Sequence, residues 1–275
     1  MIRSSASPSW GDATLPKVSV VLPTIAVDSW LDAAVASVLD QEGVDVELIV
    51  VHDGVPVDPQ RNWTRDHRVV CLSLGQRSGL AHALNLGIER ARHPLVARLD
   101  ADDIALSGRL SSQARFLSEH PDTVVLGSFA KRINECGKVT GSLGESLGGD
   151  ARNALLSRNV LIHSSVLFRA DPFHKVGRYD QSMRQMEDYD LWLRMSLEGE
   201  IRIMPEPLVA YRVHSNQMSR KASPFSNYSM QVLRARRRLA RHMGANAVAQ
   251  WQRDGIWWVA QAVRYWGFRK PRYVG

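Results

Sequence analysis

The chain has 275 residues, of which 44% are hydrophobic and 23% are charged. A chain of this size and composition can bury one large core, which excludes a disordered protein. Its two cysteines, Cys71 and Cys136, fit no metal-binding spacing and indicate reduced thiols, so we expect a cytoplasmic location. Residues 1–14 carry no apolar signal segment, and we expect them to form a flexible tail.

The formal net charge of +7 is unevenly distributed along the chain. From Arg220 onward, twelve Lys or Arg residues stand against one acidic residue, Asp254, which gives a balance of +11. The first 219 residues hold the other 23 basic and 27 acidic residues, a balance of −4. The body is therefore mildly acidic, and the basic character belongs to residues 220–275.

Strand and helix patterns alternate from the beginning of the chain. Residues 17–22 form an apolar, β-branched run that ends at Pro23, as expected of a buried strand. Asp28 is a suitable N-cap for the helix that follows, and residues 47–51 form a second apolar run before His-Asp-Gly. Continuously apolar strands separated by helices predict a parallel sheet with helices on both faces.

The same alternation continues towards residue 103. Residues 69–74 and 95–99 are predicted strands, and residues 80–91 between them are a predicted helix. Ligands of open α/β sheets bind at the carboxyl ends of the strands. The polar residues that follow these strands should therefore share one rim: Pro23, Thr24, Asp53 and residues 100–103.

The elements after residue 103 are less regular. The loop that we expect over 137–150 is rich in Gly and Ser and suits a mobile lid. The other expected elements are a helix over 109–119, a strand over 124–129, a strand over 160–168 and a helix over 187–197.

The sharpest local signal is Asp-Ala-Asp-Asp at 100–103, which follows a predicted buried strand. Three carboxylates in four residues repel one another unless a cation or solvent screens them. Clustered hard oxygen ligands suit Mn²⁺ or Mg²⁺, and such a cation also holds diphosphates. A helix N-cap with solvated neighbours is the alternative interpretation, and the spacing alone does not decide between them.

Six motifs follow one another along the chain: 19–24 (SVVLPT), 48–54 (LIVVHDG), 98–103 (RLDADD), 163–169 (HSSVLFR), 187–194 (EDYDLWLR) and 211–214 (YRVH). Their order resembles that of glycosyltransferase family 2, and the resemblance covers about residues 16–219. It implies an α/β protein with the GT-A fold over 15–219, in which a Rossmann-like nucleotide half (about 15–105) joins an acceptor half (about 106–219). It also implies an inverting transferase with a nucleotide-sugar donor.

The resemblance implies a donor pocket at the first two motifs. Pro23 and Thr24 would line it, and Asp53 would accept a hydrogen bond from the donor's base. A UDP-sugar is the expected donor. Nearby positions depart from the family pattern and leave the base open: His52, Val55 and the pair 25–26.

The later motifs imply the catalytic residues. Asp102 would bind the metal, and Asp100 would contact ribose or a metal-bound water. Asp188 would be the general base that deprotonates the acceptor hydroxyl, so that attack opposite the leaving diphosphate inverts the anomeric carbon. His214 is a candidate metal ligand, since imidazole binds Mn²⁺, and a non-ligand role is equally open.

Two further residues are candidates for the acceptor side. Glu187 immediately precedes Asp188, and His163 lies in the fourth motif. Each assignment has a structural alternative. Asp188 would then only cap its helix, and His163 would only support the fold.

Residues 220–275 predict a basic, Trp-rich extension of two amphipathic helices. Trp on one side and Arg or Lys on the other suit an anionic membrane surface, which would place the protein peripherally at the inner face of the cell membrane. Packing of the apolar side on the catalytic domain is the alternative. The apolar stripes comprise Val232, Ala235, Leu239 and Met243 in the first helix, and Val248, Trp251, Trp258, Val259, Ala262 and Trp266 in the second.

The expected function is sugar transfer to a saccharide or lipid-linked acceptor in the synthesis of a cell-surface polysaccharide or glycoconjugate. A nucleic-acid-binding protein would use the basic extension but leaves the acidic rim unexplained, so we expect no nucleic-acid partner. A nucleotidyltransferase would use a similar sheet and metal. The chain lacks a Gly-rich, basic triphosphate loop after the first strand, because residues 24–30 are TIAVDSW.

Overall fold

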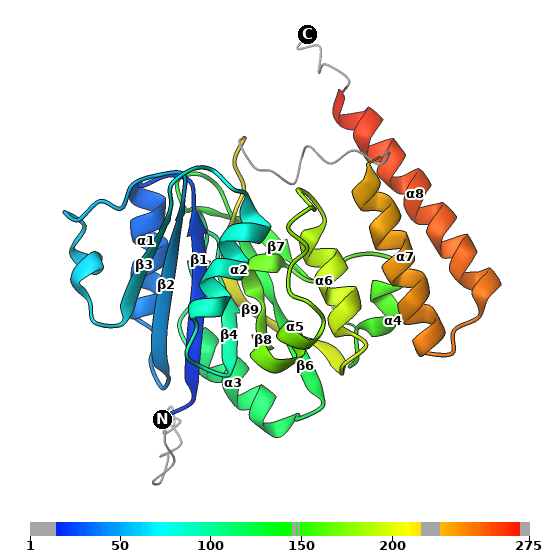
Figure 1. The fold of residues 1–275 in the computed structure, drawn as a ribbon, viewed down its shortest axis with the longest axis horizontal. Coiled ribbons are helices and arrows are strands. Elements are labelled where there is room, and N and C mark those ends of the chain that lie inside the picture. Colours follow the sequence, from blue (N-terminus) through cyan, green and yellow to red (C-terminus); the bar gives the residue numbers. More distant parts are fainter. Residues whose placement is uncertain (1–14, 145–146, 148, 216–225, 270–275) are drawn as a thin grey trace, which may run out of the picture.

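The computed structural model describes residues 15–144, 147, 149–215 and 226–269, and the tail expected over 1–14 lies outside them. In this described part, nine strands form one sheet with the order β3-β2-β1-β4-β8-β6-β9-β5, and β7 pairs with β6 (Figure 1). Helices lie on both sides of the sheet, and two further helices stand at one end of the molecule.

Four parallel strands form the first half of the sheet, as the alternating pattern predicted. β1 (Lys17–Thr24) lies between β2 (Asp45–Asp53) and β4 (Leu95–Arg98), and β3 (Val69–Leu74) pairs with β2. Every residue of β1 after the first, and every residue of β2 after the first, is buried, which explains the wholly apolar runs over 20–22 and 48–51.

The second half of the sheet mixes strand directions. β8 (Leu167–Arg169) is antiparallel to β4 and to β6 (Thr123–Ile133), whereas β9 (Glu200–Arg212) runs parallel to β6. The short β5 (Ile104–Ala105) follows the acidic run and pairs antiparallel with the end of β9. This pairing brings the residues that follow β9 to the acidic run.

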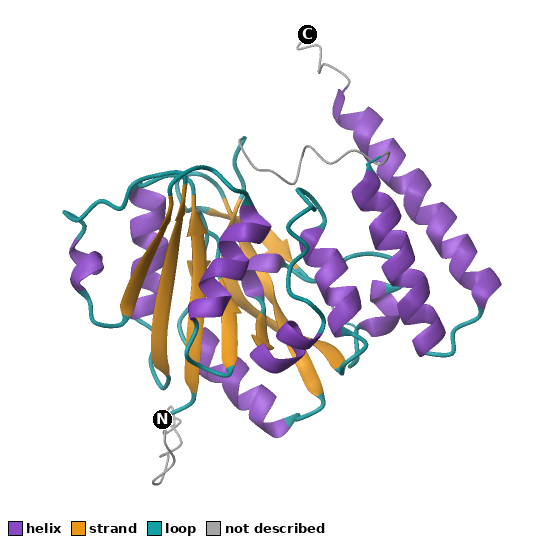
Figure 2. Ribbon diagram, in the orientation of Figure 1, coloured by secondary structure: helices purple, strands orange, loops and turns teal. Residues whose placement is uncertain are grey.

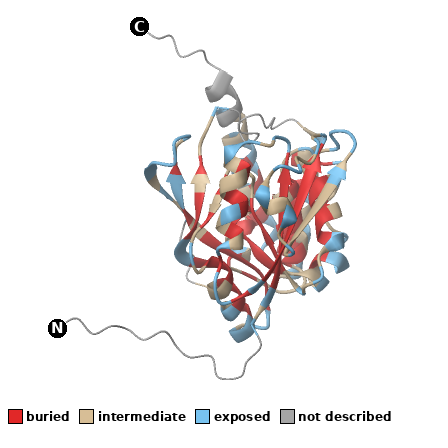
Figure 3. Ribbon diagram, turned by 90° about the vertical axis from the view of Figure 1, so that its left-hand side faces the viewer, coloured by how far each residue is buried: buried red, intermediate tan, exposed pale blue. Residues whose placement is uncertain are grey.

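Helices cover both faces of the sheet (Figure 2). The side chains of β1 alternate between the two faces: Val20 belongs to the core under α1 and α3, and Val21 belongs to the core under α2, α5 and α6. Buried residues concentrate in the strands between these layers (Figure 3). The bounds are α1 (Ser29–Leu39), α2 (Leu80–Arg90), α3 (Arg109–Glu119), α4 (Arg152–Leu155), α5 (Ala170–Lys175) and α6 (Glu187–Met195), with a 3₁₀ turn η1 (Asn62–Arg65).

The N-cap predicted for the first helix is confirmed. The Asp28 carboxylate accepts the backbone N–H groups of Trp30 and Leu31, each at 3.0 Å. These bonds satisfy two of the donors that a helix start leaves without partners. The loop after β1 therefore turns into α1 at a defined residue.

Two segments differ from the sequence-based expectations. The strand expected over 160–168 is instead a 3₁₀ turn, η2 (His163–Ser165), followed by the short β8. The backbone N–H and the hydroxyl of Ser165 both donate to the Ile162 carbonyl at 2.8 Å, which closes the turn. Within the loop expected over 137–150, β7 (Val139–Leu143) forms a strand on β6, and residues 145, 146 and 148 lie outside the described residues.

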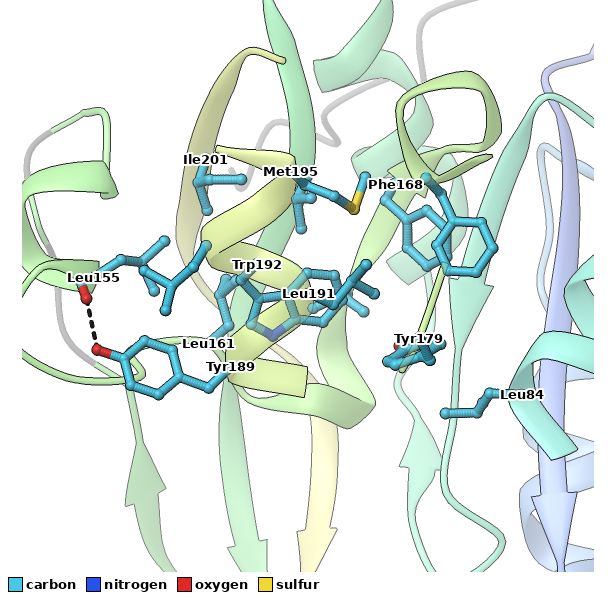
Figure 4. Packing of buried hydrophobic residues seen from close by; sticks show 14 of the residues in the cluster. Leu84, Leu155, Leu161, Phe168, Tyr179, Tyr189, Leu191, Trp192, Met195 and Ile201 are labelled. Atoms are coloured by element: carbon cyan, nitrogen blue, oxygen red, sulfur yellow. Dashed lines mark hydrogen bonds between the residues drawn. The ribbon is translucent and has the colours of Figure 1, made fainter. Parts of the chain in front are cut away.

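An aromatic cluster anchors α6 (Figure 4). Trp192 is fully buried, and its ring lies 6.3 Å from that of Phe168 and 6.5 Å from that of Tyr179. The Tyr189 hydroxyl donates to the Leu155 carbonyl at 2.6 Å. Because several large side chains hold the helix, its first residues have a defined position relative to the sheet.

The first helix of the basic extension packs on the body. In α7 (Asn227–His242), Val232 and Leu239 are fully buried in the same core as α6, and the buried Arg236 donates to the Leu156 carbonyl at 2.8 Å. For α7, the packing alternative is therefore correct. α8 (Ala247–Arg269) lies along α7, and no helix in the described part of the chain is long and apolar enough to cross a membrane.

Candidate active site

The ends of β1 and β2 lie side by side at the rim, because Thr24 pairs with His52 in the parallel register. The Thr24 hydroxyl is bonded to the Ala26 backbone and closes the loop after β1. Pro23, one residue earlier, is buried. Both residues that were expected to line a donor pocket thus belong to this rim.

Asp53 fastens the end of β2 to the start of α2. Its carboxylate accepts the backbone N–H groups of Ser78 at 2.6 Å and Gly79 at 2.9 Å. Each carboxylate oxygen accepts more than one hydrogen bond, so these contacts leave acceptor capacity for a ligand. Gly54 is required next to it, since a Cβ there would lie 2.7 Å from the Arg77 backbone nitrogen.

The acidic run forms a tight turn after β4. Carboxylate oxygens of Asp100, Asp102 and Asp103 lie within 4.8 Å of one another. The Asp100 backbone N–H donates to the Ser164 hydroxyl at 2.9 Å, which ties the turn to η2. The run leads into β5 rather than into a helix, so the alternative of a helix N-cap is wrong.

Arg98 supplies the nearest positive charge. Its side chain is buried beneath the turn, and its guanidinium group holds the Asp100 carboxylate through two hydrogen bonds. Burial raises the pKa of the Asp100 carboxyl to about 6, and the charge of Asp102 adds to this, while Arg98 opposes it. Burial also raises the pKa of Glu187 and of Asp188, and the charge of Arg98 opposes that rise, so Arg98 is a shared countercharge for several acids.

The end of β9 reaches the acidic turn across 112 residues of sequence. His214 Nε2 lies 2.8 Å from Asp102 Oδ2, and its ring lies 5.1 Å from that of Trp30. Arg212 donates through Nε to the Asp102 carbonyl at 2.8 Å and through its backbone N–H to the Asp103 carboxylate at 2.7 Å. The structure therefore brings the two predicted metal ligands, Asp102 and His214, into contact.

The chemistry of this cluster fits a hard divalent cation. Asp103 is 1% exposed, and its Oδ2 has no hydrogen-bond partner among the described residues. Burial, together with the charges of Asp100 and Asp102, raises the pKa of Asp103 well above its usual value. A cation beside three carboxylates and an imidazole would neutralise this repulsion, and Mn²⁺ and Mg²⁺ accept such ligands.

Asp188 lies in the first turn of α6. Its carboxylate accepts the Asn159 side-chain amide at 2.8 Å and the Tyr189 backbone N–H at 2.7 Å. The N-cap residue is Met186, whose side chain makes no capping hydrogen bond, so the bond from Tyr189 lets Asp188 satisfy one free donor of the first turn, while the bond from Asn159 comes from outside the helix. Burial raises the pKa of Asp188, and the hydrogen bonds from Tyr189 and Asn159 oppose that rise.

The residue before α6, Met186, has a strained backbone conformation. Met186 has a left-handed conformation with φ of 62°, which side-chain-bearing residues adopt at a cost of about 1–3 kcal/mol. The next residue, Glu187, is 8% exposed, and burial raises its pKa to about 7, with the charge of Asp188 adding to the effect. The charge of Asp188 also raises the pKa of Asp100, so the start of α6 is close enough to the acidic turn for the two carboxylates to interact.

His163, in η2, contacts α6. Its Nε2 lies 2.8 Å from the Tyr179 hydroxyl, and its ring packs 5.8 Å from that of Trp192. Burial lowers the pKa of His163 well below its usual value, with the charge of Arg98 contributing, so the ring stays neutral. These contacts support the fold, and a role towards an acceptor stays a prediction.

Three residues of the site were given no role in the sequence analysis. Arg98 and Arg212 both lie inside the motifs quoted above. The contact of Arg98 with Asp100 could have been predicted, because residues two apart in an extended chain lie on the same side of it. Asn159 carried no such signal. It contacts Asp188 across 29 residues, through a meeting of loops that periodicity does not reveal.

The family model for glycosyl transferase family 2 matches residues 19–177, more than half of the chain. The amylovoran biosynthesis glycosyltransferase AmsE of Erwinia amylovora is 33% identical over 64% of this chain and 67% of its own length. The O-antigen biosynthesis glycosyltransferase WbnJ of Escherichia coli is 29% identical over 78% of this chain and 88% of its own length. An Escherichia coli UDP-Gal:alpha-D-GlcNAc-diphosphoundecaprenol beta-1,3-galactosyltransferase is 28% identical over 67% of this chain and 69% of its own length.

The fold is similar to that of S. aureus TarS. TarS residues 1–349 in complex with UDP-GlcNAc match with a TM-score of 0.66 and 18% identity, over 92% of this chain and 73% of that one. The chain spans 43% of a longer TarS structure. The family match and this likeness lead to one conclusion: the chain belongs to glycosyltransferase family 2 and has the GT-A fold with added C-terminal helices.

Proposed function

We propose that this glycosyltransferase moves a sugar, with inversion, from a UDP-sugar to a hydroxyl of a saccharide or lipid-linked acceptor. One observation carries the proposal: the acidic turn after β4 gathers three carboxylates, and Asp188, held by Asn159 at the start of α6, is near enough for its charge to raise the pKa of Asp100. The acidic turn would take the leaving diphosphate, and Asp188 would take the proton of the attacking hydroxyl.

The donor is proposed to bind along the ends of β1, β2 and β4. Asp53 would accept a hydrogen bond from the base, while Pro23 and Thr24 line the same pocket. The related structure of TarS contains UDP-GlcNAc, and the related galactosyltransferase is named for a UDP-sugar. These two names support uridine as the base.

Asp102 and His214 are proposed to hold Mn²⁺ or Mg²⁺, with Asp100 towards the ribose or a metal-bound water. The contact between these two residues and the orphaned oxygen of Asp103 support this assignment. When bound, the cation would supply positive charge to the leaving diphosphate. Arg98 would keep Asp100 in place through its two hydrogen bonds.

Asp188 is proposed as the general base. Its hydrogen bonds from Asn159 and Tyr189 fix the carboxylate, and its raised pKa makes it a stronger base than an ordinary Asp. It would take the proton of the acceptor hydroxyl as the oxygen bonds to the anomeric carbon and the diphosphate leaves. Glu187 and His163 would line the acceptor side.

The names of the relatives support the proposed class of acceptor. They belong to the synthesis of amylovoran and O-antigen, and one of them names a diphosphoundecaprenol-linked sugar. We therefore propose a growing saccharide, free or lipid-linked, in the synthesis of a cell-surface polysaccharide.

Calorimetry with UDP, CDP, GDP and dTDP, each with and without Mn²⁺, tests the donor site. UDP with Mn²⁺ should bind most tightly to the wild-type protein, and Asp102→Ala should lose the effect of the metal. Asp45→Ala is a matched control, because Asp45 is exposed at the opposite end of β2 from Asp53. Absence of binding by every nucleotide, or binding that ignores the metal, would contradict the proposal.

A further inference from the structure

α8 has two unlike sides. Gln250, Asp254 and Trp257 are at most 5% exposed and face the body, and Gln250 donates to the Leu156 carbonyl at 3.1 Å. The opposite side is apolar and open to solvent. It consists of Val248 (66% exposed), Trp251 (69%), Ile256 (71%), Val259 (59%) and Val263 (65%), which we call the α8 apolar face.

The α8 apolar face is a continuous feature. At about 3.6 residues per turn, its five members fall on one side of the helix, with Gln252 and Gly255 among them. The described residues outside α8 expose four other large apolar side chains, each on a different segment: Leu15, Ile25, Val139 and Met230. Scattered exposure of that kind is ordinary, whereas a gathered apolar stripe marks an interaction surface.

The charges next to this face select the kind of partner. Residues 226–263 hold six arginines and one acid, Asp254, which is already paired with Arg236 at 3.3 Å and Arg237 at 2.8 Å. Arg234, Arg238 and Arg241 are exposed on the adjoining α7. This excess of positive charge would repel a second copy of the same surface, and it attracts an anionic one.

We propose that the α8 apolar face docks on an anionic lipid bilayer, lying in the plane of the interface with the arginines of α7 close to the lipid phosphates. α8 rises towards the side of the molecule at which the parallel strands end (Figure 1). The binding itself does not depend on the proposed transfer reaction.

Co-sedimentation with vesicles tests the docking. Wild-type protein should bind phosphatidylglycerol–phosphatidylcholine vesicles, with binding that weakens as salt rises, and should bind pure phosphatidylcholine less. The double variant Trp251→Glu/Val259→Glu should bind the anionic vesicles about tenfold or more weakly, since it removes two side chains from the apolar contact. Val139→Glu is the matched control and should bind as wild type does, because Val139 is an exposed valine on β7.

A second variant tests the charges alone. Arg234→Gln/Arg238→Gln/Arg241→Gln should lose most of the preference for anionic over neutral vesicles while keeping the apolar face. Far-ultraviolet circular dichroism and UDP calorimetry on each variant establish that the catalytic domain is folded. Failure of nucleotide binding in the wild type would count against the proposed function and not against the docking.

Three outcomes would overturn the proposal. The first is that the wild type fails to bind anionic vesicles. The second is that the double glutamate variant binds them as well as the wild type does. The third is a concentration-dependent dimer in sedimentation velocity that the double variant abolishes, which would make a second copy of the chain the partner of this face.

Discussion

Two adjacent carboxylates at the start of α6 have different environments. Glu187 is almost fully buried, and its pKa is raised to about 7, so it carries a proton for much of the time near neutral pH. Asp188 receives two hydrogen bonds that favour its charged form. Their different surroundings thus favour the neutral form of Glu187 and the charged form of Asp188 that a base needs.

This difference predicts a pH-dependent effect of Glu187→Gln on stability. A carboxyl whose pKa is raised by folding binds its proton more tightly in the folded state, so its contribution is present below pH 4.5 and is lost as pH rises through about 7. Denaturant unfolding should find the variant more stable than the wild type by roughly 1–3 kcal/mol at pH 8, with the gain shrinking towards pH 5. An equal effect at both pH values would contradict the raised pKa.

The metal assignment predicts loss of activity on chelation. EDTA should abolish transfer, and Mn²⁺ or Mg²⁺ should restore it, because Asp102 and His214 are proposed to hold the cation. Asp102→Ala should remain folded and inactive, and Mn²⁺ should raise the melting temperature of the wild type but not of this variant. Full turnover by the chelated enzyme would rule out the assignment.

At the scale of elements, Asp53 joins a strand to a helix. Its carboxylate holds the backbone of residues 78 and 79 at the start of α2. Asp53→Ala should weaken UDP binding by about 1–3 kcal/mol, the usual effect of losing a charged hydrogen-bond partner. Calorimetry measures this loss, and unchanged affinity would remove Asp53 from the donor site.

Hydrogen exchange separates the two effects of Asp53→Ala. Loss of the ties to residues 78 and 79 should speed exchange at those amides. Asp45→Ala, at the other end of the same strand, should change neither exchange nor affinity. Faster exchange with unchanged affinity would show that Asp53 has only a structural role.

The parallel half of the sheet could be predicted from the sequence almost residue by residue. β1 and β2 are buried on both faces, so residues 20–22 and 48–51 are wholly apolar and the strands end at polar residues. The strand expected over 160–168 was wrong because the bonds of Ser165 to Ile162 turn the chain there. Such a local side-chain bond leaves no hydrophobic period.

The site was predictable where it follows a strand end and less so where distant segments meet. The positions of Asp53 and residues 100–103 at one rim follow from parallel pairing alone. The contact of His214 with Asp102 depends on the antiparallel pairing of β5 with β9, and β5 has only two residues. A strand of that length has no recognisable pattern in the sequence.

At the scale of the whole molecule, the basic extension divides into two parts. α7 contributes Val232 and Leu239 to the core, whereas α8 adds Trp257 to the same core and leaves its opposite side exposed. Judged by charge and Trp content alone, residues 220–275 looked like one unit. The burial of each helix, which depends on its neighbours, separates them.

Truncation tests this division. A chain that ends at residue 225 should lose at least about 3–6 kcal/mol of unfolding free energy, since Val232 and Leu239 each contribute roughly 1.5–3 kcal/mol on burial. A chain that ends at residue 246 keeps α7 and should lose less, because Trp257 is the one described residue of α8 in that core. Chemical denaturation compares the two, and a stable, nucleotide-binding chain ending at 225 would show that α7 is dispensable.

The central claim is that Asp188 removes the acceptor proton in a single inverting displacement. The most direct measurement combines the kcat of Asp188→Asn with the anomeric configuration of the product. The variant should bind UDP and Mn²⁺ as the wild type does and lose about 10²- to 10⁴-fold in kcat, because the amide cannot accept the proton. Asp190→Asn, on the same helix but paired with Arg194 at 2.7 Å, should retain far more activity. NMR should find a β linkage from an α-linked donor, whereas full kcat in Asp188→Asn or an α-linked product would contradict the mechanism.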